Sequence, residues 1–174
     1  MEIRLGVTHT PSLWVQLVNQ LGADIHWTHA LVQCKKRGEM YQHHQWIVEA
    51  GAHGVVLRPW EPERYYEYGL YRLKEPTLMH DEMWAFAMGE VGKRYRFEAL
   101  PIIARRVLKK IFGRFVERPR VAGARGGFIG AGEVCTSLAD KVFLWGGFDL
   151  VPYEKSAFVL PDELADSKLL ERIE

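Results

Sequence analysis

The sequence predicts an α+β domain in which an antiparallel sheet packs against helices. The first half of the chain carries runs of β-branched and aromatic residues at 28–34, 40–49, 53–60 and 68–74. The second half carries apolar residues at helical spacing. Because the links between the strand runs are short, we expect neighbouring strands to be antiparallel. A chain of 174 residues can bury one sizeable core, so we expect residues 1–174 to form a single domain.

The first half is expected to begin with a strand and a helix. Alternation over residues 2–7 predicts the strand. Pro11 and Ser12 open a helix that Gly22 ends, with an apolar face made of Leu13, Trp14, Leu17, Val18 and Leu21. The strand runs that follow are separated by breaks at Arg37-Gly38, Ala50-Gly51 and Pro59/Pro62.

The second half is expected to be helical over residues 79–91, 98–115 and 135–145, with a loop from Glu117 to Gly132. Gly146 and Gly147 close the third helix, which begins at Cys135. We expect its face of Leu138, Ala139, Val142 and Trp145 to be buried against the sheet, and Asp140 and Lys141 to face water. A short helix starting at Pro161 and a final turn complete the chain.

Composition excludes several function classes. The net charge of +1 gives no support for a nucleic-acid partner. The basic stretch Arg94–Arg125 is expected to be a solvated surface, with contact to an anionic polymer or membrane as the alternative. No long apolar run predicts a transmembrane helix, and no signal peptide is seen. We therefore expect a cytoplasmic protein, with release by lysis or packaging into a phage particle left open.

The two cysteines predict different environments rather than a disulfide framework. Cys34 ends a strand run and is expected to be a buried small side chain. Cys135 begins a helix, where the helix dipole stabilises a thiolate, the nucleophilic form of cysteine. His29 heads one strand run and Glu49 ends the next, so an antiparallel pairing of the two runs would place a carboxylate beside the imidazole. A thiol, an imidazole and an orienting carboxylate are the groups that a cysteine hydrolase needs.

These residues lie in segments that resemble the circularly permuted NlpC/P60-type, papain-like hydrolases. In ordinary papain-like enzymes the cysteine precedes the histidine, whereas in this family the order is reversed, as it is here. Six segments resemble the family's sequence pattern in the right order, over about residues 25–166: Thr28-His29-Ala30-Leu31-Val32, Ile47-Val48-Glu49-Ala50, Gly54-Val55-Val56-Leu57-Arg58-Pro59, Gly92-Lys93-Arg94-Tyr95-Arg96-Phe97, Phe128 through Cys135-Thr136-Ser137-Leu138-Ala139, and Leu160-Pro161-Asp162-Glu163-Leu164.

The chain departs from the family pattern at three places. The family's "C-S-E" is Cys135-Thr136-Ser137 here, so the acidic residue is absent. The aspartate of the family's "Y-D" is replaced by Arg96. A long glycine-rich segment precedes the cysteine. These departures leave the three catalytic residue types in place and bear on substrate preference and activity.

The resemblance implies a papain-like fold with the nucleophile helix C-terminal in the chain, and a cysteine peptidase or amidase. Cys135 would be the nucleophile, His29 the base and Glu49 the group that fixes the imidazole, while Tyr95 would border the substrate. The substrate implied is an amide, as in the peptide stems of cell-wall peptidoglycan, and neither a metal nor an organic cofactor is needed. From the residues alone, His43, His44 and His53 are rival orienting groups. A zinc site is not expected, because Cys34 is the only thiol near these histidines and no C-x-x-C or H-E-x-x-H spacing exists.

Two other interpretations use the same residues. The first keeps the chemistry and changes the substrate to an acyl chain on a lipid or protein, with the basic stretch docking on anionic lipid. The second is a non-enzymatic structural or binding module with a relic site, such as a part of a phage particle. A fold alone does not choose between these functions.

Overall fold

The computed structural model describes the 174-residue chain except for residues 13–15, 17–18, 21–24, 36–44, 96–133 and 153–158. Its centre is a six-stranded sheet in the order β4-β3-β2-β1-β5-β6, in which every neighbouring pair is antiparallel. The strands are β1 (Glu2–His9), β2 (His29–Lys35), β3 (Trp46–Gly51), β4 (Gly54–Pro59), β5 (Glu67–Leu73) and β6 (Leu170–Arg172). The predicted α+β class with an antiparallel sheet is confirmed.

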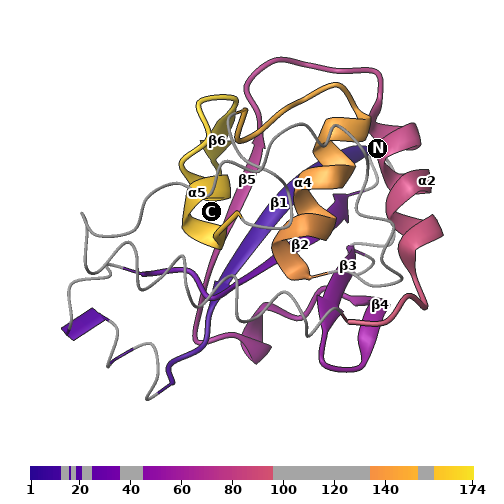
Figure 1. The fold of residues 1–174 in the computed structure, drawn as a ribbon. Coiled ribbons are helices and arrows are strands. Elements are labelled where there is room, and N and C mark those ends of the chain that lie inside the picture. The colour runs from indigo at the N-terminus through magenta and orange to yellow at the C-terminus, as the bar shows by residue number, and fades with distance from the viewer. Residues whose placement is uncertain (13–15, 17–18, 21–24, 36–44, 96–133, 153–158) are drawn as a thin grey trace, which may run out of the picture.

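Helices of the described residues pack around this sheet. They are the short 3₁₀ helix η1 (Pro62–Arg64) and the α-helices α2 (His80–Glu90), α4 (Cys135–Trp145) and α5 (Pro161–Ala165). Figure 1 shows α4 lying across β2 and β3, with α2 beside it and α5 near β1, and the contacts between these elements agree. None of these helices combines the length and the apolar character needed to span a bilayer.

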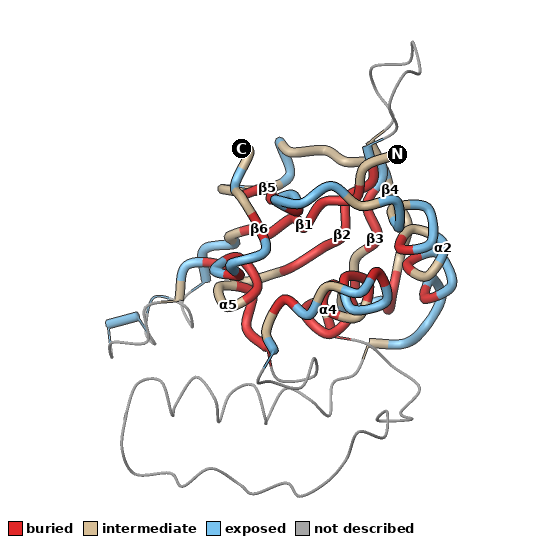
Figure 2. Tube along the Cα trace, turned by 90° about the horizontal axis from the view of Figure 1, so that it is seen from above, coloured by how far each residue is buried: buried red, intermediate tan, exposed pale blue. Residues whose placement is uncertain are grey.

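The hydrophobic core lies between the sheet and the helices. Figure 2 shows that buried residues are concentrated in β1, β2 and β3 and along α4, whereas much of α2 is exposed. The apolar alternation of β1 supplies Ile3, Leu5 and Val7 to this core. The helices supply side chains that are fully buried, including Met83, Leu138, Val142, Phe143 and Leu164.

Three of the four residues that were predicted to form the buried face of α4 are buried, and the fourth is exposed. A further residue, which was predicted to face water, is buried. Leu138, Ala139 and Val142 are fully buried, as expected. Trp145 is 60% exposed and lies in the last turn of the helix, where its ring stacks on that of Phe86 at a centroid distance of 5.0 Å. Asp140, expected to face water, is only 4% exposed. The helix packs against α2 as well as β2 and β3, so its buried arc is wider than a single stripe.

Most predicted elements of the described residues are present within a few residues of the expected bounds. One expectation is wrong: the residues expected to form a final turn include β6, which pairs with β5 through Leu73 and Leu170. Several predictions lie mostly or entirely outside the described residues, namely the helix opened by Pro11, the helix 98–115, the loop up to Gly132 and nearly all of the basic stretch Arg94–Arg125.

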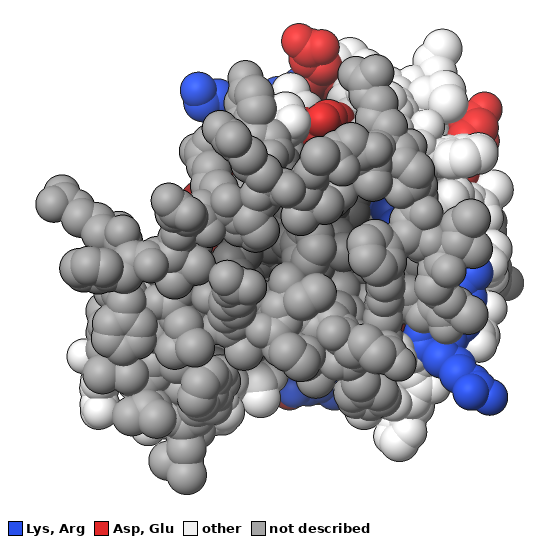
Figure 3. Space-filling view, in the orientation of Figure 1, with Lys and Arg blue, Asp and Glu red and all other residues white. Residues whose placement is uncertain are grey.

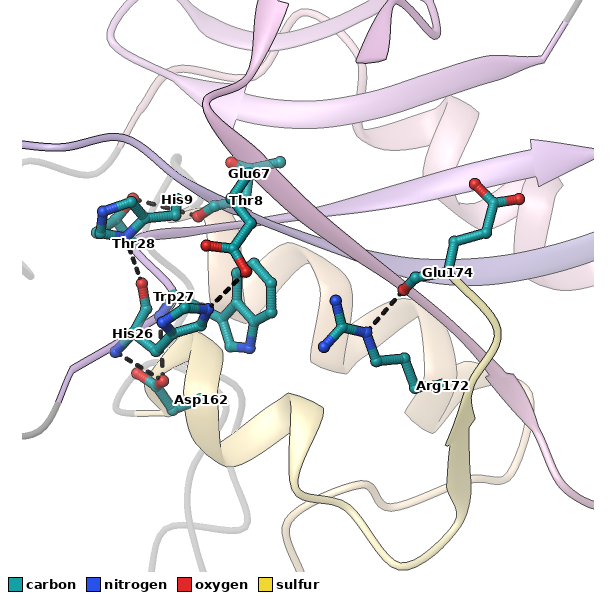
Figure 4. A network of polar contacts seen from close by, with 9 residues as sticks. All are labelled: Thr8, His9, His26, Trp27, Thr28, Glu67, Asp162, Arg172 and Glu174. Carbon is teal, nitrogen blue, oxygen red and sulfur yellow. Dashed lines mark hydrogen bonds and ion pairs between the residues drawn. The ribbon is translucent and has the colours of Figure 1, made fainter. Parts of the chain in front are cut away.

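The segment that leads into β2 is held by α5. One carboxylate oxygen of Asp162 accepts hydrogen bonds from the backbone N–H groups of both His26 and Trp27, each at 3.0 Å. Figure 4 shows this contact, together with the bond from Thr28 back to the backbone of Thr8 in β1. Asp162 belongs to the last of the six segments that resemble the permuted family, Leu160-Pro161-Asp162-Glu163-Leu164. Here it fixes the start of the strand that carries His29.

Charged side chains of the described residues do not form a large patch of one sign on the face seen in Figure 1. In Figure 3 the visible acidic and basic groups of these residues are scattered around the edge of that face.

Candidate functional site

The nucleophile candidate is the first residue of α4. Val134 has an extended backbone, and its N–H donates to Ser137 Oγ at 3.0 Å, which caps the helix one residue before Cys135. Ser137 stands where the related pattern has an acidic residue, and it is buried, so here this position serves the helix start. The cap places the Cys135 thiol at the end of the helix where backbone N–H groups are unpaired.

Several groups act on the thiol of Cys135. Burial raises its pKa, but His29 lowers it by charge and by a side-chain hydrogen bond. The backbone N–H groups of Ala30 and Thr136 lower it further by hydrogen bonding to the sulfur. The net result is a thiol pKa below its ordinary value, as a nucleophilic cysteine requires.

The imidazole of His29 lies between Cys135 and Glu49. His29 Nε2 donates to Glu49 Oε2 at 2.9 Å. The sheet register explains this contact, because Leu31 lies directly opposite Glu49 and His29 is two residues from Leu31 along β2. A diagonal pair of this kind on one side of a sheet is within reach of long side chains. Since Nε2 is used by Glu49, Nδ1 is the ring nitrogen that remains for the thiol.

His29 is held in its protonated form. Burial lowers its pKa, but the charge and hydrogen bond of Cys135 and those of Glu49 raise it more, to about 10. A raised histidine pKa beside a lowered cysteine pKa shifts the pair toward the thiolate–imidazolium form. The His29 side chain is 23% exposed, and Cys135 is partly buried.

The carboxylate of Glu49 has a second partner that the sequence did not predict. Its other oxygen, Oε1, accepts from Arg58 Nε at 2.5 Å, and Arg58 in turn donates through Nη2 to the hydroxyl of Tyr65. Burial raises the pKa of Glu49, but hydrogen bonds and charges from His29 and Arg58 lower it overall. The pairing of β3 with β4 is what identifies Arg58. In this pairing Arg58 lies opposite Ile47, which is two residues from Glu49 on the same side of β3.

Tyr95 is placed beside the thiol by the turn between β3 and β4. Gly54 has a φ of 101°, and a Cβ there would lie 2.5 Å from the backbone oxygen of Lys93. That close approach lets Val55 N donate to Lys93 O at 2.8 Å, which lays the segment leading to Tyr95 along β4. Burial and the negative charge of Cys135 raise the pKa of Tyr95 to about 12, so the phenol keeps its proton and can donate.

The structure thus brings together all four residues singled out from the sequence: Cys135, His29, Glu49 and Tyr95. The rivals are placed differently. His53 lies exposed in the β3–β4 turn, and His43 and His44 lie outside the described residues. Cys34 is buried in β2, as expected, at 2% exposure. Among the described residues, no group of three or more His, Cys, Asp or Glu side chains is arranged to hold a metal ion.

Comparison of the chain with models of known protein families, with curated proteins and with solved structures found no match.

Proposed function

We propose that this protein is a cysteine hydrolase of the permuted papain-like type that cleaves an amide bond. The observation that carries the proposal is the line of contacts from Cys135 through His29 to Glu49, in which the thiol pKa is lowered and the imidazole pKa is raised. A partly buried glutamate bound to a histidine that in turn meets the cysteine at the start of a helix is the arrangement of an orienting group, a base and a nucleophile. The six segments that resemble the permuted family support the same interpretation.

In the proposed acylation step, the Cys135 thiolate attacks the carbonyl carbon of the substrate and forms a carbon–sulfur bond. The oxyanion accepts hydrogen bonds from backbone N–H groups at the start of α4, including that of Cys135; one such donor is typically worth about 10²–10³ in rate. The protonated His29 then gives its proton to the leaving nitrogen as the carbon–nitrogen bond breaks. The products are a free amine and an acyl thioester on Cys135.

In the deacylation step, neutral His29 removes a proton from a water molecule, which attacks the thioester carbonyl. Breaking the carbon–sulfur bond releases the carboxylic acid and restores the thiolate beside protonated His29. Glu49 keeps the imidazole in one orientation through both steps and stabilises its positive charge. Tyr95, whose phenol lies near the sulfur, is a donor for the bound substrate.

The proposed substrate class is the peptide stem of cell-wall peptidoglycan, on the strength of the family resemblance. The test is hydrolysis of purified muropeptides by the wild-type protein and by Cys135→Ala, with Cys34→Ala as the matched control. We expect new amine and acid products with the wild type and with Cys34→Ala, and none with Cys135→Ala. Hydrolysis of p-nitrophenyl acyl esters and acyl thioesters without any muropeptide cleavage would replace the amide substrate with an acyl one. No activity on either class would favour a module with a relic site.

A further inference from the structure

We propose that Arg58 is a positioning residue of this site: it holds Glu49 by one carboxylate oxygen so that the other stays directed at His29 and the carboxylate stays ionised. This inference rests on the proposed function for its catalytic meaning, but its test reads the ionisation of Cys135 and needs no substrate.

The two oxygens of Glu49 are in different ion pairs, and the Tyr65 hydroxyl also hydrogen-bonds to this carboxylate. Oε2 accepts from His29 at 2.9 Å, and Oε1 accepts from Arg58 Nε at 2.5 Å. The Glu49 side chain is 13% exposed. A carboxylate in such a place would lose much of its solvation, and a charged hydrogen bond to Arg compensates for that loss. Fixing one oxygen also prevents rotation of the carboxylate, so the second oxygen can approach the imidazole only from one direction.

Arg58 is itself fixed, as a positioning group must be. It lies in β4 opposite Ile47, and its side chain is only 22% exposed. Its Nη2 donates to the Tyr65 hydroxyl, and the Tyr65 ring stacks on Trp60 at a centroid distance of 5.3 Å. Arg58 therefore has hydrogen bonds at two of its nitrogens, to side chains on two different segments, which locks the planar guanidinium in one orientation.

The charges that face each group determine the direction of the effect. Glu49 faces His29 from β2, Arg58 from β4, and Tyr65 from the segment after η1. Arg58 faces Glu49, Tyr65 and Glu61, and the Cys135 thiol faces His29 and Tyr95. Removing the positive charge of Arg58 lets Glu49 bind a proton at a higher pH. A protonated or misdirected Glu49 no longer stabilises protonated His29, and the thiolate that depends on His29 then forms at a higher pH.

The experiment measures the rate of Cys135 alkylation by iodoacetamide from pH 4 to 8, with the labelled site read by mass spectrometry. In Arg58→Met we expect the acid limb of this profile to move up by about one pH unit, so that alkylation at a fixed acidic pH falls about tenfold. Arg58→Lys keeps the charge and should recover part of the shift. The matched control is Arg72→Met, which removes another arginine bonded through Nε to a glutamate, Glu171, far from the thiol in the fold. That profile should equal the wild type.

Tyr65→Phe provides the second variant, because it keeps the ring and removes the hydroxyl that accepts from Arg58 and also bonds to Glu49. We expect a smaller shift in the same direction, and this variant decides the matter if Arg58→Met does not fold. An acid limb unchanged in folded Arg58→Met, or in Tyr65→Phe when Arg58→Met is unfolded, overturns the proposal. Because the readout is the thiol alone, a protein that shifts as expected but cleaves no amide would refute the proposed function and leave this inference standing.

Discussion

Cys135 and Cys34 are two thiols of one chain in opposite surroundings. Cys135 has His29 and two backbone N–H donors around its sulfur, and its pKa is lowered. Cys34 is buried in the core at the end of β2. At pH 6 an ordinary thiol with a pKa of about 8.5 is almost entirely protonated and reacts slowly. We therefore predict that iodoacetamide at pH 6 labels Cys135 first, as read by mass spectrometry of the folded protein.

The control for this prediction is the same protein unfolded in guanidinium chloride, where both thiols should label at similar, slow rates. Equal labelling of Cys34 and Cys135 in the folded protein, or labelling of Cys34 first, would contradict the thiolate–imidazolium pair. The pair itself should respond to His29, so His29→Ala should slow the labelling of Cys135 at pH 6 while leaving Cys34 unchanged.

The proposal that Glu49 acts on His29 rather than on the substrate predicts a particular kinetic pattern. The Glu49→Gln variant keeps a hydrogen-bond acceptor near His29 but loses the charge that stabilises its protonated form. We expect kcat to fall by about 10²-fold, at the lower end of what acid–base groups contribute, with little change in KM. Steady-state kinetics on the substrate found by the hydrolysis assay is the measurement. Glu171→Gln, on an exposed glutamate of β6, is the control and should behave as wild type.

At the residue scale, the sequence predicted the thiol, the imidazole and their immediate partners better than it predicted Arg58 and Tyr65, which contact Glu49. Cys135, His29 and Glu49 were selected by residue type, position within an element and chain order, and Tyr95 by the family resemblance; the fold brings the four together. Arg58 and Tyr65 were not selected, because an arginine on a strand and a tyrosine after a turn are usually surface residues. Their role follows from the register of β3 and β4, which residue types alone do not specify.

At the scale of elements, the β3–β4 turn links the sheet to Tyr95 and makes Gly54 hard to replace. Gly54 has a positive φ, and a side chain there would meet the Lys93 backbone oxygen at 2.5 Å. We predict that Gly54→Ala lowers the free energy of unfolding by about 2 kcal/mol or more, because backbone strain and a backbone clash add. Urea denaturation measures this. Gly51→Ala, across the same turn, is the matched control, since a Cβ at Gly51 meets nothing within 4 Å.

The elements themselves could be predicted where local pattern and tertiary environment agree. The alternation of β1 and the β-branched runs of β2 and β4 predicted those strands within a few residues. The prediction failed for β6, whose three residues have no periodic pattern and become a strand only because β5 offers an unpaired edge. It also failed for Asp140 in α4, which is buried although a single amphipathic stripe leaves it exposed.

At the scale of the whole molecule, the core depends on segments from both ends of the chain. The residues after position 131 contribute Leu138, Val142, Phe143, Leu164 and Leu170 to it. Fully burying side chains of this kind stabilises a protein by about 1.5–3 kcal/mol each, so together they supply roughly as much as the net stability of a typical domain. We predict that a fragment of residues 1–131 loses cooperative thermal unfolding, followed by circular dichroism. A cooperative transition in that fragment would show that the strands and α2 hold a core without α4.

The chain order of the site also has a consequence for how the protein becomes reactive. His29 and Glu49 lie on strands that leave the ribosome before Cys135 does. At a synthesis rate of 5–20 residues/s, the time between them is on the order of ten seconds. The pKa of Cys135 is then lowered only when α4 packs against β2, which carries His29. Rapid alkylation of Cys135 would therefore indicate that folding is complete. Pulsed alkylation at pH 6 during refolding should label Cys135 only after the circular dichroism signal has recovered. Labelling ahead of that signal would mean that the thiol is activated in a partly folded chain.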